Sequence, residues 1–197
     1  MLGVLNEAEF ANPDRYERWR SKAMGWDEMR RRAEGGIYDM REMKIRRGSV
    51  LFRIGHSKSD RGAVPNEINL SSPWWMSDEA FLDICASVRI TGIELQSLGR
   101  YKLSVADRYG VFDTVFQVVT CGPLGAFRGV GVPVFEGGED GGTLRPLAWP
   151  GHEVPQYFIP GLRDLDSNKP TGLAAEAFVR RPEMPVSIWM HHLDRLS

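Results

Sequence analysis

The sequence predicts an α+β fold in which N-terminal helices pack on a curved, mostly antiparallel sheet. Tryptophan and methionine recur at helical spacing among the charged residues of 12–34, which is typical of amphipathic helices. An apolar strand begins at Val50, and short β-like runs fill residues 92–119, where Gly99 and Gly110 separate them. Helices therefore come first and strands follow.

The chain divides into an N-terminal helical segment, residues 1–47, and a single domain, residues 48–197. The whole chain has 197 residues, of which 42% are hydrophobic, so it can form one full-sized core. Asn12, before Pro13, is the expected N-cap of the first helix. The segment is expected to pack on the domain.

Within the domain, the residue patterns predict one central helix among several strands. Ser77 is the expected N-cap of that helix. Residues 127–151 are dense in glycine and proline, as in a loop or a hairpin tip. The other expected elements are a strand at 50–54, a turn at 69–73, a helix at 78–86, strands at 92–96, 101–105, 111–119 and 156–161, and a strand-like run at 186–190.

Composition excludes several classes of function. The 25 basic and 26 acidic side chains nearly cancel, so no strong overall field favours nucleic acid or an anionic membrane. No membrane-spanning apolar stretch or signal-peptide core is visible, which favours a cytoplasmic location. Cys85 and Cys121 lack disulfide or metal-ligand spacing, and no histidine lies in a zinc motif, so no metal is expected.

Arg53 interrupts the apolar strand Val-Leu-Phe-Arg-Ile at 50–54. Burying an unpaired guanidinium is unfavourable by several kcal/mol, so we expect Arg53 to face a cleft or a partner that accepts its hydrogen bonds. The structural alternative is an ion pair with a buried carboxylate such as Glu94. Only a ligand-facing arginine would indicate function.

Three features together resemble the bacterial ADP-ribosyltransferase superfamily. They are Leu51-Phe52-Arg53 on a strand, Leu70-Ser71-Ser72 in a turn before a helix, and a late strand that opens on Gln156 and closes in Ile-Pro. The resemblance implies a sheet of ADP-ribosyltransferase type with NAD as the substrate. It also implies that Arg53 grips the phosphates or ribose of NAD, while Ser71 and Ser72 shape the nicotinamide site.

The sequence departs from this family at the catalytic position. Where a glutamate is expected, the chain has Gln156, with Glu153 three residues earlier. A glutamine on such a strand is similar to the tuberculosis necrotizing toxin branch, which implies NAD hydrolysis with water as acceptor. If a bulge at Val154-Pro155 re-aims Glu153, the activity becomes mono-ADP-ribosylation of a protein or nucleic acid. The resemblance also implies a toxin or effector, delivered to a target cell without a classical signal peptide, and a cognate inhibitor or immunity protein.

Further residues are candidate NAD contacts. His56 could contact a phosphate or ribose hydroxyl, or be an exposed bystander. Neighbouring Trp74 and Trp75 should point to opposite faces, so one belongs to the core and Trp74 is taken as the ligand contact. If Gln156 faces a cleft, Phe158 faces it too.

The serine turn has its own structural alternative, because Ser71 and Ser72 precede Pro73, and such residues commonly form turns without a ligand. Two other classes of function compete with NAD cleavage. Cys121 with His152 has the order of a cysteine hydrolase, although the end of a strand is a poor place to lower a thiol pKa. A non-catalytic immunity or adaptor protein could use the tryptophans and the Gly-rich loop for contact.

Overall fold

The computed structural model describes residues 3–12, 37–59, 62–105, 110–131, 135–136, 145–146, 154–164 and 167–194. The helices expected in residues 12–34 therefore lie almost wholly outside the described residues, as does the glycine-rich centre at 137–142. The described part of the N-terminus contains one short helix, α1 (Glu7–Phe10). Asn6 attaches it to the sheet, because its side-chain amide bonds both the N–H and the carbonyl of Gly125.

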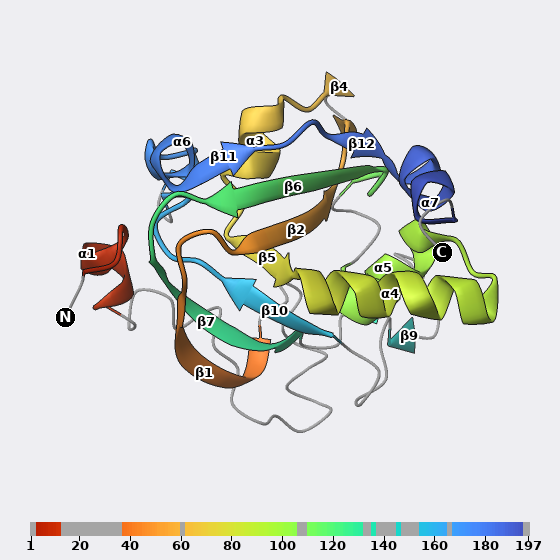
Figure 1. Cartoon of the computed structure of the whole chain (residues 1–197), viewed down its shortest axis with the longest axis horizontal. Helices are drawn as coiled ribbons and strands as arrows, with labels where there is room; N and C mark the ends of the chain where they lie inside the picture. The colour runs from red at the N-terminus through yellow and green to blue at the C-terminus, as the bar shows by residue number, and fades with distance from the viewer. Residues whose placement is uncertain are drawn as a thin grey trace.

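The predicted α+β class with an antiparallel sheet is confirmed. Every strand pairing in the described part of the chain is antiparallel, and the main sheet has the order β1-β7-β10-β5-β2-β6-β11, with β12 also paired to β6. The sheet curves strongly (Figure 1). Its strands are β1 (Ile37–Ile45), β2 (Val50–Gly55), β5 (Trp74–Ser77), β6 (Thr114–Thr120), β7 (Leu124–Gly131), β10 (Pro155–Phe158), β11 (Phe178–Arg180) and β12 (Met184–Pro185).

Two short hairpins complete the strands, and β1 starts the sheet earlier than expected. The hairpins are β3 (Lys58–Ser59) with β4 (Gly62–Ala63), and β8 (Phe135–Glu136) with β9 (Arg145–Pro146). Strand β1 falls inside residues 1–47, the segment expected to be helical, and pairs along its length with β7. The C-terminal part of that segment is therefore an edge strand of the domain.

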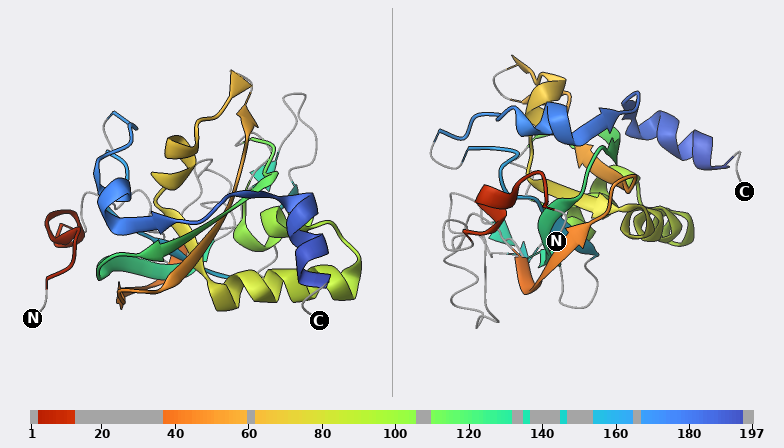
Figure 2. Two further views of the ribbon diagram at one scale, coloured as in Figure 1. Left: turned by 45° about the horizontal axis from the view of Figure 1, so that its top comes forward. Right: turned by 60° about the vertical axis from the view of Figure 1, so that its left-hand side comes forward.

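The sheet has two faces with different coverings, which Figure 2 shows from two further sides. We call one the α4 face: α4 (Asp78–Thr91), α5 (Leu95–Leu103) and α7 (Val186–Asp194) pack on it against Phe52 and Ile54. We call the other the α3 face: α3 (Asn66–Leu70) and α6 (Leu173–Ala177) pack on it against Leu51 and Trp75. Successive residues of β2 alternate between the two faces, as strand geometry requires.

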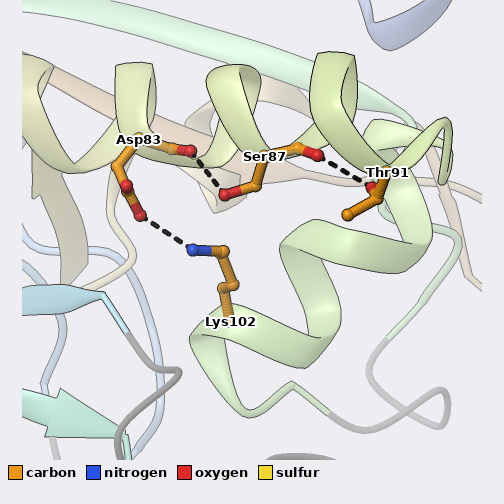
Figure 3. A network of polar contacts seen from close by, with 4 residues as sticks. All are labelled: Asp83, Ser87, Thr91 and Lys102. Carbon is orange, nitrogen blue, oxygen red and sulfur yellow. Dashed lines mark hydrogen bonds and ion pairs between the residues drawn. The ribbon is translucent and has the colours of Figure 1, made fainter.

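Helix α4 was predicted at its start and extends further than expected. The Ser77 hydroxyl accepts a hydrogen bond from the Ala80 N–H at 3.2 Å, which confirms the N-cap. The helix ends at Gly92, whose φ of 69° is the left-handed C-cap conformation. Lys102 Nζ of α5 lies 2.8 Å from Asp83 Oδ2 of α4, so an ion pair joins the two helices (Figure 3).

Three strand predictions were wrong because short apolar runs have ambiguous periodicity. Helix α5 includes the end of the run expected as a strand at 92–96 and the start of the run expected at 101–105, and its Leu95, Leu98 and Leu103 are buried together. The run at 186–190 belongs to helix α7, where Trp189 packs edge-on against Phe52. Tertiary packing on the α4 face therefore decides the helical state. None of the described helices combines the length and the apolar character needed to cross a membrane.

Candidate functional site

Arg53 lies on β2, at the point where β2 stops pairing with β5. The β2–β5 ladder contains Leu51 with Ser77 and Phe52 with Met76, and Arg53 follows it. The Arg53 side chain reaches back across this junction, and its Nη1 donates to the Trp74 carbonyl at 3.0 Å. Arg53 Nε is buried without a partner. Its Nη2 has no hydrogen bond in the described part of the chain.

Arg163 is a second arginine at the same place, and the sequence analysis missed it. It follows β10 by five residues, after the turn that contains Gly161. Its Nη2 donates to the Ile68 carbonyl at 2.7 Å and to Ser71 Oγ at 3.2 Å. Its Nη1 lies 3.4 Å from Asn168 Oδ1, and its Nε is buried without a partner. The one available signal was an arginine closing the apolar run after the late strand.

Neither arginine has a carboxylate partner among the residues that the structure describes. Burial, and then the charge of Arg163, lower the pKa of Arg53 to about 9. Burial also lowers the pKa of Arg163. The alternative in which Glu94 pairs with Arg53 is not formed, because Glu94 is exposed at the start of α5. Both guanidiniums remain cations at neutral pH, and no carboxylate of the described residues forms an ion pair with either of them.

His56 directly follows β2, three residues after Arg53, and its neighbour Gly55 is the last residue of that strand. The Asn69 side chain holds its backbone: Nδ2 donates to the His56 carbonyl at 3.0 Å, and Oδ1 accepts from the His56 N–H at 3.3 Å. A Cβ on Gly55 would lie 2.3 Å from Asn69 Oδ1, so this clamp requires glycine. Half-burial lowers the pKa of His56, and nearby Arg53 lowers it further. His56 is therefore a neutral, half-buried side chain and not an exposed bystander.

A strained segment packs against the His56 ring. Phe112 has a φ of 58°, an unfavourable conformation for a bulky residue, and Gly110 has a φ of 121°. A Cβ on Gly110 would lie 2.7 Å from His56 Cγ, so the backbone runs directly over the imidazole. The fold thus holds the His56 ring from one side.

Gln156 does not join this group. It lies on β10, and its Nε2 donates to the carbonyl of Leu103, the last residue of α5, at 2.9 Å. Leu103 and Val154 belong to the core of the α4 face, whereas Tyr157 packs on the α3 face. Because alternate strand residues face opposite sides, Gln156 and Arg53 point away from each other across the sheet.

The other predicted contacts divide in the same way. Trp75 is 1% exposed in the α3-face core, and Trp74 is half-buried on the opposite side, so the predicted alternation is confirmed. Trp74 lies edge-on to Phe158, with ring centroids 5.0 Å apart, and Phe158 is 2% exposed. Phe158 is therefore a core residue in a separate cluster with Ile37 and does not share a face with Arg53.

The two serines of the turn are buried and have different roles. Ser72 Oγ accepts from the Trp74 N–H at 3.3 Å, and the Ser72 carbonyl accepts from Trp75 Nε1 at 2.8 Å. Ser71 Oγ donates to the Ile68 carbonyl and accepts from Arg163. Ser72 thus supports the start of β5, and Ser71 is the serine that contacts an arginine.

Two further candidates are only partly placed. Glu153 and His152 lie outside the described residues. The structure therefore tests neither the prediction that Glu153 is the catalytic carboxylate nor the prediction that Cys121 pairs with His152. Cys121 lies in a bend after β6, where its N–H donates to the Ala177 carbonyl at 2.8 Å, and not at a helix N-terminus. In the described part of the chain, no cluster of histidine, cysteine and carboxylates could hold a metal ion.

Comparisons with known proteins give little. No family model matches the chain. No curated protein matches it either. One solved structure, Rhs1-CT in complex with cognate immunity protein RhsI1, aligns over 90% of this chain and 93% of that chain, at 9% sequence identity and a TM-score of 0.46.

Proposed function

We propose that this chain is an NAD-consuming enzyme that cleaves the nicotinamide–ribose bond with water as the acceptor. The observation that carries the proposal is Arg53, a half-buried cation without a carboxylate partner whose Nη2 is free of hydrogen bonds in the described part of the chain. A buried charge is retained at a cost to stability unless a counterion compensates it, and perturbed groups concentrate at functional sites. The diphosphate of NAD would supply that counterion.

The chemistry suits such a site. Cleavage breaks the bond between ribose C1′ and the nicotinamide nitrogen, and the bonding electrons leave with nicotinamide. A water oxygen then bonds to C1′ and releases a proton, so the products are nicotinamide and ADP-ribose. The protein has to hold the diphosphate and orient the ribose, for which a guanidinium is well suited because it binds phosphate oxygens in a fixed fork.

The remaining site assignments stay predictions. The charge of Arg53 lowers the pKa of His56, and Ser71 accepts a hydrogen bond from Arg163. These two interactions support the inclusion of His56 and Ser71 in the proposed site. The ribose contact by Gln156 or Glu153 has no support from the described geometry, since Gln156 bonds Leu103 on the other face. A role as a bacterial toxin or effector with a cognate immunity protein belongs to the same proposal and rests on the motif resemblance.

A second candidate function is binding without turnover, as in an interaction or adaptor protein. The specific observation in its favour is the position of Gln156, which is turned away from Arg53 and already hydrogen-bonded. Such a protein would bind a phosphate-bearing ligand at the arginines and release no nicotinamide. ADP-ribosylation of a macromolecule is the third candidate and depends on Glu153.

The test is incubation of the purified protein with NAD, with free nicotinamide followed by chromatography. Arg53→Ala is the test variant, and Arg180→Ala is the matched control because Arg180 is exposed and ion-paired to Glu183 at 2.7 Å. Release by the wild type and the control, but not by Arg53→Ala, supports NAD cleavage. Labelled NAD with candidate acceptors then separates hydrolysis from transfer. No release by folded wild type leaves the binding function.

A further inference from the structure

We propose that Arg163 is the second ligand-binding guanidinium of this site, and that Arg53 and Arg163 each hold one phosphoryl group of a diphosphate. The inference rests on the proposed function for its choice of a dinucleotide as ligand. It does not depend on bond cleavage, because a protein that only binds would use the same pair.

The first argument is the convergence of two like charges. Arg53 comes from β2 and Arg163 from the segment after β10, so tertiary folding brings them together. Arg163 donates to Ser71 Oγ, and Arg53 donates to the carbonyl of Trp74, three residues further along the same turn and strand. The charge of Arg163 accordingly lowers the pKa of Arg53. Two neighbouring, half-buried cations repel each other, and an anion that lies between them or along both replaces this repulsion by attraction.

The second argument is the way the arginines are held. The partners of Arg163 among the described residues are uncharged acceptors: the Ile68 carbonyl, Ser71 Oγ and Asn168 Oδ1. The partner of Arg53 is also uncharged, the Trp74 carbonyl. Such bonds fix the orientation of a guanidinium and leave its full positive charge available. This is what a preorganised anion site requires, whereas a structural ion pair would neutralise the charge.

The third argument concerns the ligand class. In a dinucleotide, each phosphoryl group of the diphosphate carries one negative charge, and each can be matched by one guanidinium. A nucleoside monophosphate offers a single phosphoryl group, which both arginines would have to share, whereas a diphosphate offers each arginine a phosphoryl group of its own. The pair therefore predicts selectivity for a diphosphate diester over a monophosphate.

The experiment is calorimetric binding of ADP-ribose and AMP to wild type, Arg163→Gln, Arg163→Lys and the control Arg180→Gln. We expect ADP-ribose to bind wild type and control at least about tenfold more tightly than AMP, since one charge-assisted contact contributes about that factor or more. Arg163→Gln should lose about tenfold or more for ADP-ribose and much less for AMP. Arg163→Lys keeps the charge and should lie between the two.

Several outcomes would overturn the inference. They are equal affinity for ADP-ribose and AMP in the wild type, no binding of either, or an Arg163→Gln variant that is folded and binds ADP-ribose like wild type. If Arg163→Gln does not fold, Arg163→Lys decides: unchanged ADP-ribose selectivity with a lowered melting temperature makes Arg163 structural. Selective ADP-ribose binding without nicotinamide release contradicts the proposed function alone, and release without diphosphate selectivity contradicts this inference alone.

Discussion

The α3 face and the α4 face of the sheet each hold one polar residue on an apolar strand, and the two residues differ in how far their hydrogen bonds and charge are satisfied. Gln156 on the α4 face is 7% exposed and donates to the Leu103 carbonyl, so it behaves as part of the core. Arg53 on the α3 face donates one hydrogen bond, to the Trp74 carbonyl, and has no counterion among the described residues. The positive charge of Arg163 acts on it as well. A polar residue in a strand is thus a site candidate when its bonding and charge are incomplete.

The largest expected effect is that of Arg53→Ala on NAD cleavage. It should lower kcat/KM by about 2–4 kcal/mol of transition-state stabilisation, the range for removing one preorganised electrostatic group. The melting temperature should stay within a few degrees of wild type or rise, because no described ion pair is broken. Initial rates and thermal denaturation measure the two quantities. A large fall in stability would make Arg53 a structural residue instead.

Gln156→Ala should show the opposite pattern and sharpen the contrast between the faces. The variant leaves the Leu103 carbonyl without its partner and opens space in the core, so unfolding free energy should fall by about 1–3 kcal/mol. Chemical denaturation measures it, with Gln117→Ala on β6 as a less buried control. Unchanged stability together with lost NAD cleavage would return Gln156 to the site.

The pH dependence of stability tests the Arg53 environment by itself. Because the pKa of Arg53 is lowered from its ordinary value to about 9, the folded state binds fewer protons than the unfolded state once the pH exceeds about 9. Stability should therefore gain a contribution that increases as the pH rises above about 9, and Arg53→Met should lack it. Chemical denaturation of wild type and Arg53→Met at pH 8 and pH 10 measures this contribution of Arg53 to the unfolding free energy. Identical pH profiles would mean that Arg53 is not desolvated in solution.

Ser71→Ala is expected to have the smallest effect. It removes one of the acceptors that orient Arg163 and leaves the Ile68 carbonyl in place, so ADP-ribose affinity should fall only about threefold to tenfold. Ser72→Ala is the matched control, because its hydroxyl contacts the Trp74 backbone and neither arginine. A stronger effect from Ser72→Ala than from Ser71→Ala would contradict the assignment of Ser71 to the site.

Local signals in the sequence were sufficient for part of this structure. The strand at Val50, the N-cap at Ser77 and the opposed tryptophans depend on residues near one another in the chain, and each was predicted correctly. Helices α5 and α7 were predicted wrongly as strands, because a short apolar run fits the helical and the strand periodicity equally well. Packing on the α4 face, which is a tertiary interaction, determines that they are helical.

The candidate site was less predictable than the strands. Arg163 reaches Ser71 only after the sheet has formed, and no spacing in the sequence links them. The face occupied by Gln156 depends on the register of β10 against β5 and β7, which a motif does not specify. A sequence motif can therefore place residues on the correct strands and still assign one of them to the wrong side.

The most direct test of the account is the melting temperature of wild type and Arg53→Gln measured against increasing ADP-ribose. The wild-type melting temperature should rise with ligand concentration, because an anion that binds the folded state stabilises it. Arg53→Gln should melt at or above the wild-type temperature without ligand and respond weakly to ADP-ribose. If the variant melts far below the wild type, or if ADP-ribose stabilises it as much as the wild type, Arg53 is not a binding residue for an anionic ligand.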